Sequence, residues 1–327
     1  MSNLDTAPVL KECGGRAAVS AKPVRQLLSS RQVPLGESTV VRRLLPTLNR
    51  RMIGAWCFAD HYGPDDITTE PGMRVPPHPH TGLQTVSWLL DGEILHRDSL
   101  GSEQTLRPGQ LGLMTAGRAI AHAEQSPVQH PSLLHGAQLW VALPDAARFI
   151  APKWEFHSDL PAYADSGISG TVILGELGGV ASPGITHSPL VGADLSVTAG
   201  ASVAVPLEPD FEYAVFVVEG TLDVDDAPLA PGQLLYLGCG RSSLSLRATG
   251  SGPGVGAGRL LLLGGEPFDE KIVMWWNFVA RSGEEIAQWR SEWMVGEEFG
   301  TVLGYPGAAL PAPPMPPTPL RARGRER

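Results

Sequence analysis

The chain has 327 residues, long enough for two domains, and 43% of them are hydrophobic, which is ordinary for a globular core. Its formal net charge of −9 gives no indication of binding to nucleic acid or to an anionic membrane. The 38 glycines and 30 prolines favour many short strands and turns over long helices. The 3 cysteines show neither disulfide nor zinc-knuckle spacing, which fits a reducing compartment.

We expect residues 1–20 to form a flexible arm. This region lacks the basic segment and apolar run of a signal peptide, and no apolar run elsewhere approaches the length of a transmembrane helix. The sequence therefore predicts a cytoplasmic protein. The arginine-rich stretch Lys22–Arg51 is predicted to be a solvated strand face. A role in contacting a protein partner is a weaker alternative.

A β-meander is predicted from Gly82 onward. Leu83–Leu90 has strand character, Asp91-Gly92 is a hairpin turn signal, and Glu93–Arg97 is the return strand. Further strand-like runs follow up to Leu143. We expect an N-terminal domain over residues 21–145.

A second series of short strands begins near residue 170 and repeats features of the first in the same order. Leu89-Leu-Asp-Gly92 resembles Val217-Val-Glu-Gly220, and Leu106-Arg-Pro-Gly-Gln110 resembles Leu229-Ala-Pro-Gly-Gln233. This repetition predicts an all-β fold of two tandem barrels or jelly rolls, the second over residues 146–300.

One helix is expected near residues 283–295. Ser282 can cap it, with Glu285 three residues on, and Ile286, Trp289 and Trp293 then share one face. The proline-rich tail 301–327 has few residues to bury and is predicted to be disordered.

Two pairs of polar residues flank the first meander and predict a metal site. His78 and His80 share one face of an extended segment, as do His122 and Glu124 on a later strand. Three imidazoles and a carboxylate suit Fe, Mn, Co, Ni, Cu or Zn, and leave about two positions open on a six-coordinate ion. The alternative, polar residues on exposed strand faces, fits poorly with the apolar context of His122.

The second copy supplies an internal comparison for this site. Aligning its glycine turns on those of the first copy places Pro206 and Glu208 opposite the first histidine pair. Ser245 and Arg247 fall opposite His122 and Glu124. We therefore expect the second barrel to be metal-free.

In combination, these motifs resemble the pirin family of the cupin superfamily over roughly residues 22–298. The motifs that carry the resemblance are His78-Pro-His80-Thr-Gly82, Leu89-Leu-Asp-Gly92, His96-Arg-Asp-Ser-Leu-Gly101, Arg107-Pro-Gly109, Met114-Thr-Ala-Gly-Arg118 with His122-Ala-Glu124, Gly265-Glu-Pro-Phe-Asp269 and Trp276-Asn-Phe-Val279. The resemblance implies two tandem cupin domains, jelly-roll β-barrels, with iron in the N-terminal one. It also implies that the residues matching His78, His80, His122 and Glu124 bind this iron.

Members of that family are described as flavonol (quercetin) 2,3-dioxygenases, as redox-responsive transcriptional co-regulators or as partners of metabolic enzymes. We expect a dioxygenase that binds Fe(II), a small aromatic substrate and dioxygen, with Glu124 also acting as a proton acceptor. The alternatives are a non-enzymatic, iron-responsive regulatory protein and a structural barrel with an adventitious ion. His96 and Gln84 are expected beside the ligands; Gln84 stands where the family usually has Glu, and a glutamine cannot act as a general base.

Overall fold

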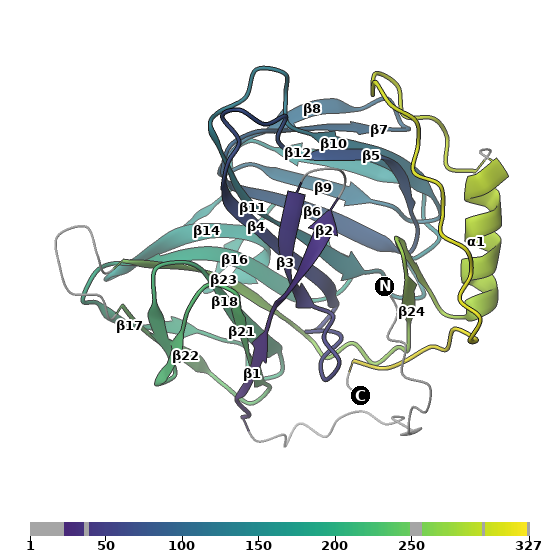
Figure 1. Cartoon of the computed structure of the whole chain (residues 1–327). Helices are drawn as coiled ribbons and strands as arrows, with labels where there is room; N and C mark the ends of the chain where they lie inside the picture. Colours follow the sequence, from purple (N-terminus) through teal and green to yellow (C-terminus); the bar gives the residue numbers. More distant parts are fainter. Residues whose placement is uncertain (1–22, 36–38, 249–256, 296–297, 326–327) are drawn as a thin grey trace.

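The structure is a computed structural model that describes residues 23–35, 39–248, 257–295 and 298–325. Two β-barrel domains lie side by side, and one helix lies against the N-terminal barrel (Figure 1). The expected all-β architecture with a short C-terminal helix is confirmed. The expected arm 1–20 lies outside the described residues. No helix in the described part of the chain has the length and apolar character needed to cross a membrane.

The N-terminal barrel consists of a seven-stranded and a four-stranded antiparallel sheet. The larger sheet contains, in spatial order, β12 (Lys153–His157), β9 (Leu111–Thr115), β6 (Leu83–Asp91), β11 (Leu133–Ala142), β4 (Trp56–Asp66), β3 (Thr39–Leu45) and β2 (Arg31–Leu35). The smaller sheet contains β5 (Arg74–His80), β10 (Ile120–Gln125), β7 (Ile94–Asp98) and β8 (Glu103–Leu106).

The C-terminal barrel repeats this arrangement with an eight-stranded and a four-stranded sheet. The larger sheet contains β1 (Gln26–Ser29), β21 (Gln233–Gly238), β18 (Glu212–Glu219), β23 (Gly258–Gly265), β16 (Leu190–Val197), β14 (Ile168–Leu177) and β13 (Ala162–Asp165), with β15 (Val180–Ala181) beside β14. The smaller sheet contains β17 (Ser202–Pro206), β22 (Ser243–Ala248), β19 (Leu222–Val224) and β20 (Ala227–Leu229).

The strands do not divide between the barrels at residue 145, which corrects the predicted boundary. Strand β1, near the N-terminus, pairs with β21 of the C-terminal barrel, with Leu27 opposite Leu235. Strand β12, beyond residue 145, pairs with β9 of the N-terminal barrel, with Trp154 opposite Met114. Each barrel is thus completed by a strand that chain order assigned to the other.

The interface between the barrels is part of a continuous core. The indole Nε1 of Trp56 lies 3.1 Å from both Val191 O and Gly264 O, and Trp56 is fully buried. Nε1 of Trp88 donates to Oδ2 of Asp194 over 2.8 Å. These bonds satisfy the polar atoms of two large buried side chains, so the barrels are held in a fixed relation.

Part of the arginine-rich stretch is engaged inside the fold, which corrects its prediction as a solvated face for Arg43 and Arg50, whereas Arg25 and Arg31 are exposed as expected. Arg43 forms two bonds with the Asp60 carboxylate, at 2.8 and 2.7 Å. Arg50 is buried with its guanidinium 3.6 Å from the ring centre of Tyr236, in the other barrel. Charge alone predicted exposure, but long cationic side chains can be buried where carboxylates and aromatic faces receive them.

The chain ends with β24 (Val273–Trp275), β25 (Phe278–Ala280), α1 (Gly283–Val295) and an irregular segment. The predicted helix and cap are confirmed: Ser282 Oγ accepts from the Glu285 N–H over 3.3 Å. Ile286 and Trp289 form its buried face.

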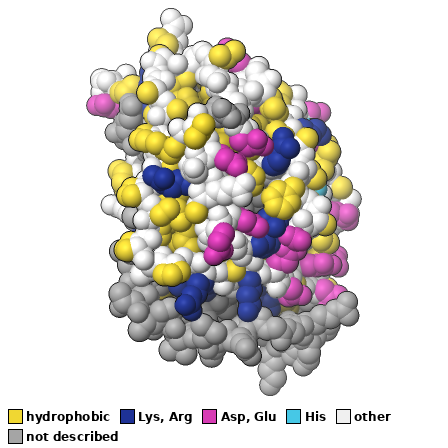
Figure 2. Space-filling view, turned by 90° about the vertical axis from the view of Figure 1, so that its right-hand side faces the viewer, with side chains coloured by type: hydrophobic (Ala, Val, Ile, Leu, Met, Phe, Trp, Pro, Cys, Tyr) yellow, Lys and Arg dark blue, Asp and Glu magenta, His cyan; other side chains and the backbone are white. Residues whose placement is uncertain are grey.

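The proline-rich segment 298–325 follows a defined path, which corrects the expectation of disorder for 301–325; residues 326–327 lie outside the described residues. Such a segment cannot form its own core, but Met315 and Leu320 pack against the cluster that contains Trp275 and Trp289. Figure 2 views the side of the molecule where α1 lies and shows apolar and charged side chains intermixed there.

Candidate metal centre

Strand β5 presents the first histidine pair. It lies at the edge of its sheet, where Pro76, Pro77 and Pro79 are tolerated because an edge strand leaves one side unpaired. Its neighbour β10 runs antiparallel, with His122 directly opposite His78. The pleat therefore directs three imidazoles from two adjacent strands into the barrel.

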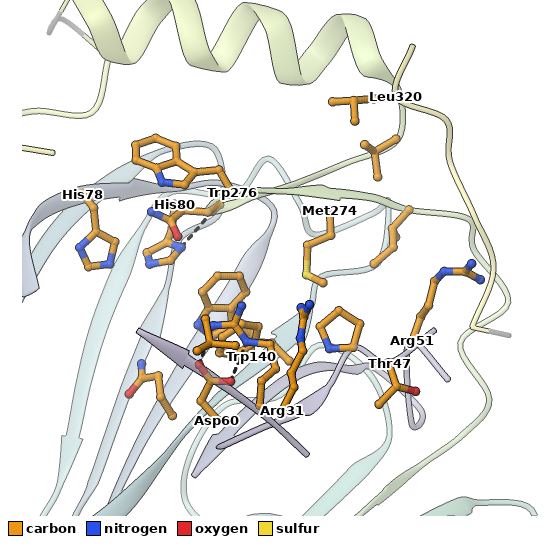
Figure 3. A pocket seen from close by; sticks show the side chains of 18 of the residues that line it. Arg31, Thr47, Arg51, Asp60, His78, His80, Trp140, Met274, Trp276 and Leu320 are labelled. Carbon is orange, nitrogen blue, oxygen red and sulfur yellow. Dashed lines mark hydrogen bonds and ion pairs between the residues drawn. The ribbon is translucent and has the colours of Figure 1, made fainter. Parts of the chain in front are cut away.

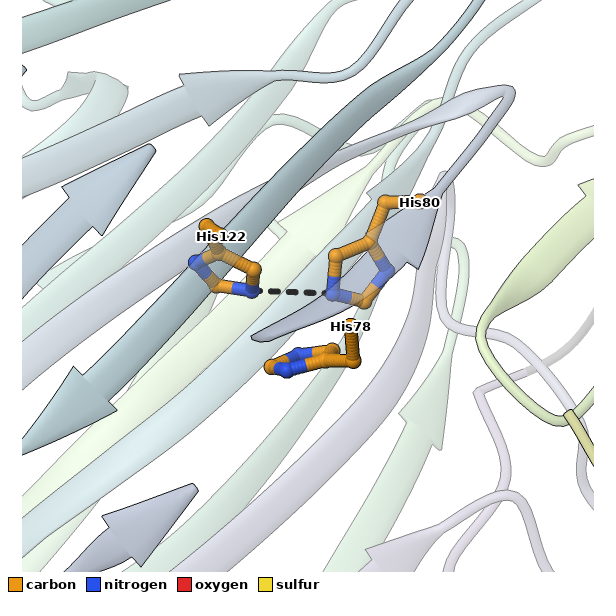
Figure 4. A group of neighbouring side chains, drawn as sticks. All are labelled: His78, His80 and His122. Carbon is orange, nitrogen blue, oxygen red and sulfur yellow. Dashed lines mark hydrogen bonds between the residues drawn. The ribbon is translucent and has the colours of Figure 1, made fainter. Parts of the chain in front are cut away.

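The three imidazoles converge. Nε2 of His80 lies 3.0 Å from Nε2 of His122, and ligand nitrogens of His78, His80 and His122 all lie within 4.8 Å of one another (Figure 4). Nitrogen ligands bound at right angles about 2.1 Å from one ion are themselves about 3.0 Å apart. The His80–His122 separation thus fits shared coordination.

Backbone carbonyls fix the orientation of two of these rings. Nδ1 of His78 lies 2.9 Å from Pro76 O, and Nδ1 of His80 lies 3.0 Å from Asn277 O. A carbonyl oxygen only accepts, so each Nδ1 must carry the proton. The Nε2 lone pair is therefore directed toward the cluster, as ligation requires.

Glu124 joins the cluster through His122. Strand β10 shifts register against β5 between these residues, and Glu124 lies opposite His96 of β7. Ligand atoms of His96, His122 and Glu124 also lie within 4.8 Å of one another. The structure thus brings the four expected ligands into two groups that share His122.

Burial sets the protonation of these groups. Loss of solvation lowers the pKa of His78 to about 4 and places the pKa values of His80 and His122 well below the ordinary value. Burial also raises the pKa of Glu124. Neutral imidazoles beside a desolvated carboxylate form a donor set that suits a divalent transition-metal ion, whose charge would compensate the carboxylate.

The immediate surroundings include residues that the sequence did not reveal. Ser87 Oγ donates to Oε1 of Glu124 over 2.9 Å and lies 3.0 Å from Oε1 of Gln138. Ser87 and Gln138 are direct partners on β6 and β11. The alternation of side chains along each strand was the only sequence signal that could have placed them at the site. His96 lies where it was expected: its Nδ1 is 3.4 Å from Nδ1 of His122, and its ring stacks on Trp154.

Gln84 does not lie beside the ligands, which corrects the sequence-based expectation. Its Nε2 donates over 2.9 Å both to Thr115 Oγ1 and to Ile185 O, a residue that follows β15. On β6, Ser87 faces the site, so Gln84 points to the opposite side of the sheet. The alternation of side chains that places His78 and His80 on one face cannot be continued to Gln84, because β5 ends at His80 and β6 belongs to another sheet.

The corresponding strand of the C-terminal barrel presents leucines inward. In β22, Leu244 and Leu246 are fully buried, whereas Ser245 and Arg247 are exposed. Nη2 of Arg247 lies 2.6 Å from Oδ2 of Asp223. The sequence alignment that placed Ser245 and Arg247 opposite the ligands was therefore wrong, because these two side chains point out of the barrel rather than into it. The metal-free state of this barrel remains a prediction.

The histidine cluster opens into a cavity of about 900 Å³. Its walls beside the cluster are mainly apolar and aromatic: Phe58, Met73, Val75, Trp140, Met274 and Trp276. Figure 3 shows His78 and His80 at one end, with Met274 between them and Arg51. The volume lies within the range of sites for small organic molecules, about 300–1,000 Å³.

Sequence profiles of known families match both barrels. Residues 38–141 match the profile described as Pirin, and residues 192–300 match the one described as Pirin C-terminal cupin domain. The chain belongs to the pirin family. The expected family and its two cupin domains are thereby confirmed.

Relatives within the pirin family cover nearly the whole chain. A Pseudomonas aeruginosa protein named "Putative quercetin 2,3-dioxygenase PA1205" is 46% identical over 292 residues, 89% of this chain and 90% of the relative. Human pirin is 30% identical over 276 residues, 82% of this chain and 91% of its own. A crystal structure titled quercetin 2,3-dioxygenase from Acinetobacter baumannii superposes with a TM-score of 0.86 at 41% identity, covering 91% of this chain and 97% of that one.

Proposed function

We propose that this member of the pirin family is a metal-dependent dioxygenase that acts on flavonols such as quercetin. The observation that carries the proposal is two buried groups of potential ligands, His78/His80/His122 and His96/His122/Glu124, which share His122 beside an aromatic-walled cavity. The names of the Pseudomonas and Acinetobacter relatives support the same activity.

The four clustered residues would hold the ion, and Fe(II) is our first choice because three imidazoles and one carboxylate suit it. The same donor set accepts nickel, copper, manganese, cobalt or zinc. When bound, a redox-active ion supplies the Lewis acidity and electron transfer that reaction with dioxygen requires.

The cavity walls suit a flat aromatic substrate. Trp140 stacks on Phe58 at a centroid distance of 4.1 Å and meets the ring of His80 edge-on at 5.0 Å. Trp276 and Met274 line the same cavity. Aromatic and thioether groups bind flat rings through dispersion and exclude water from the reacting end.

Glu124 is the proposed proton acceptor for the substrate hydroxyl. Its carboxylate is buried and accepts a hydrogen bond from Ser87, which holds it in one orientation. A carboxylate held in this way beside the site can take up the proton of a substrate hydroxyl.

The second candidate is a non-enzymatic, iron-responsive regulatory protein, which similarity to human pirin keeps open. The arginine-rich stretch offers little support for it, because Arg43 and Arg50 are held within the fold.

The test is oxygen uptake, followed together with the loss of the flavonol absorbance band, by protein loaded separately with iron, nickel, copper or manganese. We expect turnover in at least one form and none in His122→Ala. His130→Ala is the matched control, because His130 lies in the loop between β10 and β11 and its Nδ1 lies 2.8 Å from the carbonyl oxygen of its neighbour Pro131. Absence of turnover in every metal form of the wild type would contradict the proposal.

A further inference from the structure

The cavity has charged lining residues besides the histidine cluster, and Figure 3 shows one of them, Arg51, at the end opposite His78 and His80. Its walls beside the cluster are aromatic, whereas its other charged lining residues are Arg31, Arg51, Arg321 and Arg323, together with the Arg43–Asp60 pair. These arginines come from β2, from the segment before β4 and from the C-terminal segment.

The lining is strongly basic for a chain whose formal net charge is −9. Five arginines and two carboxylates line the cavity. Asp60 binds Arg43 through both oxygens, at 2.8 and 2.7 Å, and Glu124 lies beside His96 and His122. The lining therefore has an excess of three positive charges, which a divalent ion beside Glu124 would increase.

The C-terminal segment is anchored so that its arginines line the cavity. At one end, the N–H of Leu310 donates to Pro77 O over 2.8 Å, next to His78. At the other, Arg323 and Ile272 exchange backbone bonds of 2.9 and 3.0 Å. Between these points Thr318, Pro319 and Leu320 form part of the cavity wall. The C-terminal segment is therefore a structural part of the cavity wall.

We propose that these arginines form an anion subsite, and that the substrate is an aromatic molecule with an anionic group remote from the metal-binding end. Guanidinium groups bind carboxylate, sulfate or phosphate oxygens through paired hydrogen bonds. The proposal rests on the proposed function for the orientation of the substrate, with its oxidised ring toward His78, His80 and His122. Arg321 and Arg323 act as specificity-determining residues.

The test compares two probes, an unsubstituted flavonol and a flavonol with one sulfonate group. Binding is measured under anaerobic conditions by quenching of tryptophan fluorescence, because Trp140 and Trp276 line the cavity. We expect the sulfonated probe to bind about ten-fold more tightly at low salt, and the preference to shrink as salt screens the charges. A carboxylated flavonol distinguishes a general oxyanion site from a sulfonate-specific one.

Two variants remove positive charges of the subsite that come from different parts of the fold. Arg321→Gln with Arg323→Gln removes the charges of the C-terminal segment while leaving its backbone bonds possible, and Arg31→Gln removes a charge from β2. Each should reduce the preference, the double variant about ten-fold. The control is Arg107→Gln, an exposed arginine outside the cavity that pairs with Glu93.

Equal binding of the two probes by the wild type, or an unchanged preference in both variants, would overturn the subsite. Because no turnover is needed, the two proposals fail separately. A retained charge preference without oxygen uptake in any metal form supports the subsite and rejects the dioxygenase.

Discussion

Ser87 Oγ donates a hydrogen bond to Oε1 of Glu124 over 2.9 Å, and this bond joins β6 of the larger sheet to β10 of the smaller one. The bond positions the carboxylate beside the histidine cluster. Because both side chains are buried, no solvent molecule readily replaces the lost partner.

Replacing Ser87 by Ala should therefore weaken metal binding about 10- to 100-fold, the usual cost of losing a partner that orients a ligand. Competition with a chelator of known affinity measures the change. Ser245→Ala, an exposed serine of the other barrel, is the matched control. Unaltered affinity in Ser87→Ala would show that the bond does not orient a ligand.

Gln84→Glu should reduce stability without changing metal content. The substitution removes the amide that donates to Thr115 and Ile185 and brings a carboxylate against a carbonyl oxygen. We expect the free energy of unfolding to fall by about 1–3 kcal/mol. Denaturant unfolding and elemental analysis measure the two quantities, with Gln129→Glu in a surface loop as control. Altered metal content at unchanged stability would place residue 84 at the metal site.

Gln84 marks the limit of what the sequence predicts about this site. Local patterns predicted the His78/His80 and His122/Glu124 pairs, because alternation is reliable within one strand. Alternation does not continue through the corner between β5 and β6, so the facing of Gln84 was predicted wrongly. The same limit applied to Ser245 and Arg247 in the second barrel.

Contacts between residues far apart in the sequence account for the other differences between the predicted and the observed structure. Nothing local indicates that β1 completes the C-terminal barrel, since that pairing joins Leu27 to Leu235. The path of the C-terminal segment was also beyond prediction. Its composition lacks a core of its own, and only the folded surface around Trp275 and Pro77 provides one.

A second buried histidine pair should make stability depend on pH. Nε2 of His61 lies 2.8 Å from Nε2 of His135. Burial, with Arg42 nearby, lowers the pKa of His61 to about 3 and that of His135 to about 4. Between the unfolded value, about 6.5, and these pKa values, the unfolded chain binds more protons. Stability is therefore greatest above about pH 6.5 and falls as pH decreases toward 4 and 3.

The double variant His61→Gln with His135→Gln keeps side chains able to hydrogen-bond but removes this titration. Its free energy of unfolding should depend less on pH between about 6.5 and 4, by up to about two protons per chain. Chelator-treated wild type and variant, unfolded in denaturant across this range, provide the comparison. Parallel pH curves for the two proteins would mean that the pair contributes nothing.

The central claim is that His78, His80, His122 and Glu124 hold one metal ion. Its most direct test is the metal content, by elemental analysis, of wild-type protein and His122→Ala purified in parallel from the native host. We predict about one transition-metal ion per wild-type chain, because one cluster binds one ion. The variant should be nearly empty although it remains folded. Equal metal content in the two proteins would contradict the assignment.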